Sequence, residues 1–121
     1  MKPNLLFKLS GIILLINGLA AAFTSDLFLE GAGMTLDPDG ITTAQAFGAS
    51  LIALGITVFR IPSFVGNIKE AITTVIIGYL TFVVLISVHL INGQAEGPTP
   101  VVNLILNIIF IILYLIARKK V

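Results

Sequence analysis

Four long stretches without a charged residue dominate this chain. They cover residues 9–25, 40–59, 71–95 and 97–117. A helix needs about 20 predominantly apolar residues to cross the hydrocarbon core of a bilayer, which is about 30 Å thick. The first stretch is short, but Leu5, Leu6 and Phe7 extend it, and the Lys8 ammonium can reach the interface. We therefore predict four transmembrane helices, over about residues 4–24, 42–60, 68–91 and 100–117.

Composition agrees with an integral membrane protein. Of the 121 residues, 57% are hydrophobic and only 11% are charged. A soluble domain of this size needs more charge to cover its surface. The four segments use most of the chain, so we expect a single all-α membrane domain over residues 1–121. Its predicted architecture is an antiparallel bundle of four transmembrane helices, with outer loops at residues 25–41 and 92–99.

The charged residues are separated by sign along the chain. The basic residues lie before the first uncharged stretch, between the second and third, and after the fourth: Lys2, Lys8, Arg60, Lys69, Arg118, Lys119 and Lys120. The acids of the other two gaps are Asp26, Glu30, Asp37, Asp39 and Glu96, and only Glu70 breaks the pattern. Basic flanks of membrane helices stay cytoplasmic during insertion. Both termini are therefore predicted to be cytoplasmic, with the basic residues as topology anchors.

The first segment has a second interpretation, a cleavable signal peptide. Lys2 and Lys8 form a basic start, and the three alanines at 20–22 offer a small-residue cleavage site. The apolar run exceeds the roughly 7–15 residues of a usual signal core. We therefore expect the segment to be retained. Cleavage would leave the orientation of the other three segments unchanged.

Turn chemistry predicts the limits of the second helix. Residues 37–40, Asp-Pro-Asp-Gly, form a strong turn signal, and Thr42 or Thr43 is expected to cap the helix that follows. Pro62 is expected to stop this helix, because the residue before a proline avoids the helical region. The loop at 25–39 is too apolar for a free linker. We expect it to lie in the outer interface or to fold over the bundle end, with one helical turn.

Two pairs of glycines predict a contact between the first two helices. Gly11 and Gly18 are a heptad apart, and so are Gly48 and Gly55. Heptad spacing places both glycines of a pair on one face, and close backbone approach is a main source of helix association in lipid. The alternative is that glycine is simply common in membrane helices. We favour packing of these two helices through the four glycines.

Uncharged polar residues gather toward the acidic ends of the helices. His89 and Asn92 end the third segment, Asn103 and Asn107 lie early in the fourth, and Gln45 lies early in the second. A hairpin between the third and fourth segments brings His89 and Asn103 to a similar depth. The functional interpretation is a small ligand-binding pocket that opens to the outside, since ionisable groups within a membrane are functional candidates by default. His89 could relay protons or hold a polar head group.

The alternative interpretation of these polar residues is structural. Hydrogen bonds between membrane helices contribute on average about 0.6 kcal/mol each in one system, and a shallow His costs little. His89 taken alone fits this alternative better. Asn17, near the middle of the first helix, is expected to join helices rather than to line a site. For the five residues together, both interpretations stay open.

The sequence offers no catalytic motif. Without cysteine there can be no disulfide, thiolate ligand or cysteine nucleophile. A single His excludes a multi-histidine metal site within one chain. No pair of carboxylates lies in the predicted spans, and neither a nucleophile elbow nor a phosphate-binding loop occurs. Asp37 and Asp39 are explained more simply as turn formers than as calcium ligands. We therefore predict no metal and no nucleic-acid partner.

Residues 33–37 and 44–55 carry a family resemblance. An apolar loop precedes a helix entry of small residues with an aromatic–glycine step, and a second glycine follows a heptad later. The chain resembles the small four-helix bacterial membrane proteins of the DUF4345 and DoxX-like kind, which often carry Arg at the position of Gln45. The resemblance implies a bacterial inner-membrane origin and supplies no activity. Small multidrug exporters fit less well, because they need a membrane-embedded Glu where the first helix here offers only Asn17.

These patterns predict a non-enzymatic membrane protein that binds a lipid-like small molecule or a membrane partner at an outer-leaflet pocket. One alternative is a small transporter or channel subunit that acts as an oligomer. Against a pore, the cytoplasmic halves of the first and fourth helices are almost wholly apolar. Another alternative is an accessory of a membrane oxidoreductase that binds quinone or haem near His89.

The expected location is the bacterial inner membrane, with multiple spans. The expected partners are the lipid bilayer and either a second copy of the chain or a larger membrane complex. No particular cofactor is predicted. Arg118, Lys119 and Lys120 resemble a dibasic retrieval signal, which leaves a eukaryotic endomembrane origin as the alternative.

Overall fold

The computed structural model describes residues 1–35 and 37–121, and the regular structure in that part of the chain is helical. The helices are α1 (Pro3–Phe23), α2 (Ser25–Gly31), α3 (Pro38–Phe64), α4 (Ile68–Asn92) and α5 (Pro98–Lys119). Helices α1, α3, α4 and α5 are long and apolar enough to cross a membrane. The predicted fold class, a multi-pass membrane protein with a bundle of four transmembrane helices, is confirmed.

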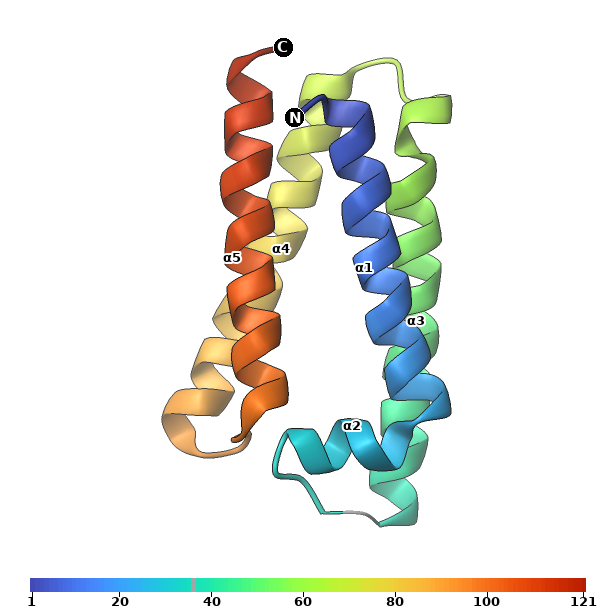
Figure 1. Ribbon diagram of the computed structural model, residues 1–121, viewed down its shortest axis with the longest axis vertical. Helices are drawn as coiled ribbons and strands as arrows, with labels where there is room; N and C mark the ends of the chain where they lie inside the picture. Colours follow the sequence, from blue (N-terminus) through green and yellow to red (C-terminus); the bar gives the residue numbers. More distant parts are fainter. Residues whose placement is uncertain (36) are drawn as a thin grey trace.

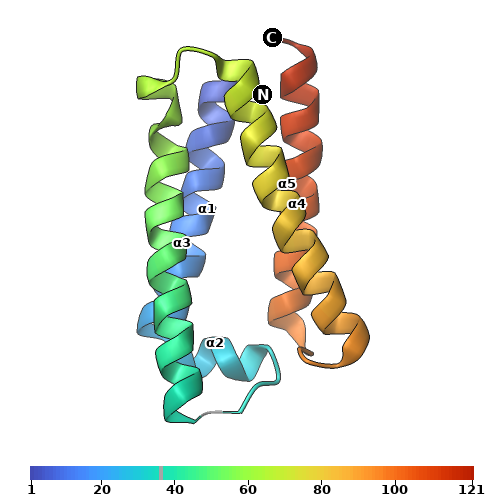
Figure 2. The ribbon, with the colours of Figure 1, turned by 180° about the vertical axis from the view of Figure 1, so that it is seen from behind.

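The four long helices form two antiparallel pairs. Helix α1 packs along α3, and α4 packs along α5. The pairs converge at the end of the bundle that carries both termini, and they separate toward the other end, where α2 lies across the gap (Figures 1 and 2). We call these the terminal end and the capped end. The separation of the pairs positions the candidate site.

Glycine backbones make the contact between α1 and α3. A Cβ atom added at Gly11 would lie 2.8 Å from the carbonyl oxygen of Gly55, and one added at Gly18 would lie 2.8 Å from that of Gly48. Real Cβ atoms do not approach so closely, so the backbones touch where these four residues meet. The heptad-spaced glycines thus lie on the facing sides of the two helices.

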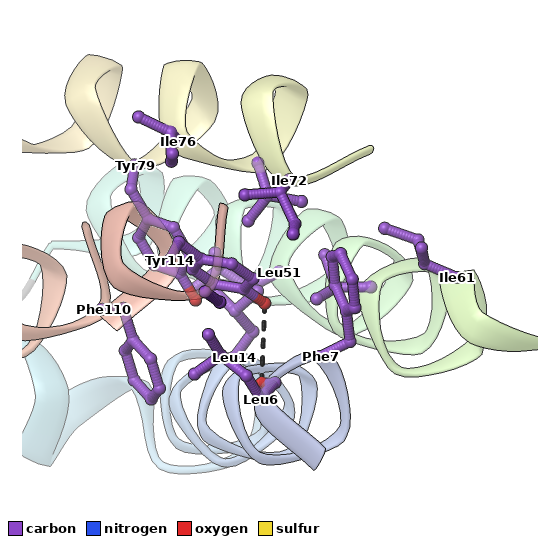
Figure 3. Packing of buried hydrophobic residues seen from close by; sticks show 13 residues of the cluster. Leu6, Phe7, Leu14, Leu51, Ile61, Ile72, Ile76, Tyr79, Phe110 and Tyr114 are labelled. Carbon is purple, nitrogen blue, oxygen red and sulfur yellow. Dashed lines mark hydrogen bonds between the residues drawn. The ribbon is translucent and has the colours of Figure 1, made fainter. Parts of the chain in front are cut away.

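The main apolar core lies toward the terminal end and joins the two pairs. Leu6 and Phe7 of α1, Ile72 of α4 and Tyr114 of α5 are inaccessible to solvent (Figure 3). The rings of Phe7 and Tyr114 lie 5.3 Å apart in a tilted arrangement. Aromatic pairs at such distances add stability beyond the area that they bury. This core closes the terminal end.

Helix α3 begins earlier than predicted. Asp37 is the N-cap, since its side chain accepts the N–H of Gly40, and Pro38 occupies the first turn. The prediction that Thr42 or Thr43 caps the helix was wrong. Their hydroxyls instead donate to the carbonyls of Pro38 and Asp39 within the helix. Asp at the cap followed by Pro is a favourable helix start, because the N–H that proline lacks would be unpaired there anyway.

Helix α3 also ends later than predicted. It continues through Pro62 to Phe64, so the prediction that Pro62 stops the helix was wrong. The preceding residue, Ile61, belongs to the buried core, and this packing outweighs its local preference against helix. The N–H of Val65 still donates to the Ile61 carbonyl at 3.0 Å, so the last turn remains closed.

The predicted outer loop 25–41 contains α2 and the first turn of α3. Ser25 and Leu29 of α2 are buried, whereas Leu27 is exposed. The remaining bounds differ from the prediction by a few residues, and α5 starts at Pro98 because a proline suits the first turn of a helix. Leu36, one of the residues that carry the family resemblance, lies outside the residues that the structure describes.

The basic residues and the acids, except Glu70, lie at opposite ends of the bundle. The basic residues belong to the start of α1, the end of α3, the start of α4 and the end of α5, all at the terminal end. There the Nε of Arg118 donates to the Thr73 hydroxyl at 2.9 Å, and the Lys8 ammonium lies 5.9 Å from the centre of the Phe59 ring. Asp26, Glu30, Asp37, Asp39 and Glu96 belong to the capped end.

Candidate functional site

A cavity of about 620 Å³ lies between the two helix pairs on the capped side of the core. Its apolar wall includes Leu14 of α1, Leu29 of α2, Phe47 and Leu51 of α3, and Phe82, Leu85 and Ile86 of α4. Its polar lining includes Asn17, Thr35, Asp37, Thr43, His89, Thr99, Asn103 and Asn107. Helices from both pairs therefore line the cavity, and α2 covers it at the capped end of the bundle.

Three of the five predicted ligand-binding residues line this cavity. They are His89 on α4 and Asn103 and Asn107 on α5, and each is half-buried. Asn103 and Asn107 follow each other by one turn, about 6 Å along the helix at 1.5 Å per residue. The amide of Asn107 donates to the Asn103 carbonyl at 2.6 Å. The hairpin thus brings α4 and α5 polar groups to one wall.

Gln45 and Asn92 do not line the cavity. Gln45 is exposed, because the neighbouring Ala44 and then Gly48 face the interior of the bundle, and one residue rotates a helix by about 100°. Asn92 ends α4. Its amide donates to the Gln94 side chain at 2.6 Å, and its side-chain oxygen accepts the Gln94 N–H at 3.0 Å. It shapes the turn after α4 rather than the site.

Asn17 lines the cavity from α1, and sequence reasoning had placed it outside the site. It also lines a neighbouring hollow of about 210 Å³, together with Asn103 and Thr99. Asn17 directly precedes Gly18, which is on the buried face of α1. Adjacency to a packing glycine was not a sufficient signal, since Leu19 on the other side of Gly18 is exposed.

The side chains of Asn17, His89 and Asn103 make no hydrogen bond to any residue within 1–35 or 37–121. Most of the side chains around them in the cavity lining are apolar. Three helices, α1, α4 and α5, therefore present amide and imidazole groups without hydrogen-bond partners in the described residues to a largely apolar cavity. The arrangement suits a molecule with an apolar body and a small polar part.

A hydrogen-bonded layer forms the floor beneath the cavity. The hydroxyls of Ser10 on α1 and Tyr114 on α5 lie 2.5 Å apart. The Tyr114 hydroxyl also donates to the Leu6 carbonyl at 3.5 Å, the dashed line in Figure 3. Phe110 and Tyr79 stack beside them with ring centres 5.6 Å apart. Sequence reasoning missed this layer, because it treated these helix halves as apolar.

A backbone contact closes the capped end. The N–H of Glu96 donates to the Ala32 carbonyl at 2.9 Å, which links the segment after α2 to the turn before α5. A Cβ added at Gly97 would lie 2.8 Å from the Gly31 carbonyl oxygen, and Gly97 has φ +88°. Both the close approach and the positive φ require glycine here. We call this contact the latch.

The site offers hydrogen-bonding groups and apolar side chains. Among the described residues, no group of three or more His, Cys, Asp or Glu side chains could hold a metal ion. His89 supplies one imidazole, which is half of the axial ligation of a six-coordinate haem. Asp37, the carboxylate that lines the cavity, already accepts the Gly40 N–H. Hydrogen bonding and apolar contact are what this lining can provide.

No family model, curated protein or solved structure matches this chain. The resemblance to proteins of the DUF4345 and DoxX-like kind stays a prediction. Of the residues that carry it, Ala44 and Phe47 line the cavity, and Gly48 and Gly55 contact α1. The residues that carry the resemblance therefore contribute to the cavity lining and to the contact between α1 and α3.

Proposed function

We propose that this chain is a non-enzymatic integral membrane protein that binds a lipid-like small molecule in the cavity at its capped end. The observation that carries the proposal is the cavity itself. Its volume of about 620 Å³ lies within the range of about 300–1,000 Å³ that is usual for small-molecule sites. Its wall is mostly apolar, and its few polar groups converge from three helices. That combination is typical of a site for an amphiphile.

The ligand would enter sideways from the bilayer. Phe47 of α3 and Leu85 of α4 line the cavity and are 40% and 50% exposed. Both belong to membrane-spanning helices, and α3 and α4 touch over only a short length. A gap bordered by such side chains faces hydrocarbon tails rather than water. An acyl or isoprenoid chain can therefore reach the cavity without leaving the membrane.

We place the capped end in the outer leaflet of a bacterial inner membrane. The support is the charge distribution, with the seven basic residues at the terminal end and five of the six acids at the capped end; Glu70 is the exception. Lys and Arg near membrane helices mark the cytoplasmic side. A reporter fused after Glu96 should read out on the periplasmic side. A cytoplasmic readout would reverse the proposed orientation.

Blocking the mouth of the cavity tests the proposed function. The protein would be purified in a mild detergent, and the lipids and small molecules that accompany it would be identified by mass spectrometry. We expect Leu85→Trp to lose most of the bound molecule, since Trp would fill the opening. Val84→Trp is the matched control, because Val84 is the adjacent residue on α4, is 62% exposed and does not line the cavity.

The test has a clear contrary result. If Leu85→Trp and Val84→Trp retain the same molecules in the same amounts, the cavity does not hold the ligand. Circular dichroism and gel filtration would show that both variants keep the helical fold. An absorption spectrum of the same samples addresses the alternative of a haem accessory, which requires a Soret band.

One observation favours a second candidate function, a small transporter subunit. The two helix pairs are separated at the capped end and closed at the terminal end by the core around Phe7, Ile72 and Tyr114. A transporter can be closed on one side of the membrane and hollow on the other in this way, and a second copy could complete the pathway. Proteoliposomes that move a labelled ligand across the bilayer would favour transport, whereas binding without movement would favour the leading proposal.

A further inference from the structure

The cavity contrasts in charge with both ends of the bundle. The basic residues lie at the terminal end, beyond the core and the Ser10–Tyr114 layer, and five of the six acids, all except Glu70, lie around the capped end. Between them, the deep lining consists of apolar side chains with Asn17, His89, Asn103 and Asn107. We infer that the ligand of this site carries an uncharged, oxygen-bearing polar head on a hydrocarbon body. The inference rests on the proposed function and narrows the chemical class of the ligand.

An anionic head would find no counter-ion in this site. None of the described residues that line the cavity is Lys or Arg. Burying an unpaired phosphate or carboxylate costs several kcal/mol, even after relaxation and water penetration. The acids Asp26, Glu30, Asp39 and Glu96 give the capped end further negative charge, which repels an anion. Free fatty acids and acidic phospholipids are therefore disfavoured.

A cationic head would find its partners only at the rim. Asp37 is the carboxylate among the described lining residues, and it lies at the start of α3, where it is exposed and caps the helix. The deeper lining is made of amides, the imidazole of His89 and apolar side chains. A cation held by Asp37 would stay in solvent at the capped-end rim of the cavity, where an ion pair contributes little. The interior of the cavity gives it no compensation.

An uncharged head matches the groups that remain. The amides of Asn17 and Asn103 each offer donors and an acceptor, and His89 offers one of each when neutral. These three side chains have no hydrogen-bond partner within the described part of the chain. A hydroxyl or carbonyl oxygen between α1, α4 and α5 would satisfy them without bringing a charge into the membrane. Diacylglycerols, isoprenoid alcohols and quinones share this chemistry.

Three probes with the same two oleoyl chains separate the possible head groups. They are dioleoylglycerol, which is uncharged, dioleoyl phosphatidic acid, which is anionic, and dioleoyl-trimethylammonium propane, which is cationic. The full-length protein would receive equal amounts of all three, and native mass spectrometry would measure how much of each it retains. We expect the protein to retain dioleoylglycerol about tenfold more than either charged probe, which corresponds to about 1.4 kcal/mol.

A charge placed in the lining should reverse this preference. Asn103→Lys puts an ammonium beside the cavity and should favour phosphatidic acid over dioleoylglycerol. Val101→Lys is the matched control, because Val101 is exposed on the same helix and lines neither hollow. That control should leave the order of the probes unchanged. Asn103→Leu should lower retention of dioleoylglycerol without raising that of the charged probes.

The outcomes distinguish this inference from the proposed function. Equal retention of the three probes, or a preference for a charged one, overturns the uncharged head while Leu85→Trp still removes the bound lipid. If Leu85→Trp leaves retention of all three probes unchanged, the proposed function fails, and the inference fails with it. Retention of dioleoylglycerol that responds to both Leu85→Trp and Asn103→Lys supports both.

Discussion

The hydroxyl of Tyr114 ties α5 to α1 at the centre of the closed end. It shares a hydrogen bond with Ser10 and reaches the Leu6 carbonyl, whereas the hydroxyl of Tyr79, one helix away, is buried without a partner among the described residues. Two tyrosines in one aromatic cluster thus differ in what their hydroxyls do. A buried hydroxyl without a partner lowers stability, and a bonded one raises it modestly.

At the residue scale, the two tyrosines should respond differently to loss of the hydroxyl. Tyr114→Phe should lower the free energy of unfolding by about 0.6 kcal/mol, the average measured for hydrogen bonds between helices in one membrane protein, and by no more than about 1.7 kcal/mol, the maximum measured there. Tyr79→Phe keeps the ring and should leave stability unchanged or raise it slightly. Unfolding in mixed detergent and dodecyl sulfate micelles, followed by circular dichroism, measures both. Equal losses would mean that the Tyr79 hydroxyl is also bonded.

At the element scale, the α1–α3 contact depends on the absence of side chains. A Cβ added at Gly48 would lie 2.5 Å from the backbone nitrogen of Ala22 and 2.6 Å from the Gly18 carbonyl oxygen. Gly78, midway along α4, has nothing within 4 Å of the same added atom. Helix α1 must therefore move before any residue other than glycine fits at position 48, whereas position 78 is open.

Alanine at these two glycines should have opposite effects. Gly48→Ala should lower the free energy of unfolding by about 1–3 kcal/mol, the usual cost of overpacking a close contact. Gly78→Ala should be neutral or stabilising, since alanine favours helix over glycine by about 1 kcal/mol. The same micelle titration measures both changes. A stable Gly48→Ala variant would contradict the close backbone contact.

Hydropathy and charge were sufficient to predict the spans, since both are local properties of the chain. The rotation of each helix about its axis is not local, and the errors at Gln45 and Asn17 came from it. Ala44 faces the cavity and Gln45 does not, although they are neighbours and only Gln45 is polar. Asn17 was missed for the same reason. Pro62 was misjudged because the packing of Ile61 outweighed a backbone preference.

At the scale of the whole molecule, two closures control how far the helix pairs separate. The aromatic core holds the terminal end, and the latch between the Ala32 carbonyl and the Glu96 N–H holds the capped end. The latch involves far fewer residues than the aromatic core does. Gly97 lies against Gly31 within it, whereas Gly93, with φ +78°, has open space around it.

Weakening the latch should let the capped ends of the pairs move apart. Gly97→Ala adds both backbone strain and a clash with Gly31, whereas Gly93→Ala adds strain alone. Because the chain has no cysteine, Gln45→Cys and Ile91→Cys can each carry a spin label at an exposed position on α3 and α4. We expect double electron–electron resonance to show longer, broader distances in Gly97→Ala than in Gly93→Ala. Identical distributions would show that the latch does not hold the capped end.

The pairing of helices also bears on how the protein is made. Every residue of the glycine contact between α1 and α3 lies before Phe64, and the partner pair consists of the two helices that follow. Chains generally fold from the N-terminus during synthesis, at about 5–20 residues per second. The α1–α3 half can therefore assemble beside the translocon before the ribosome has finished α4. It would then present a completed surface on which the second hairpin docks.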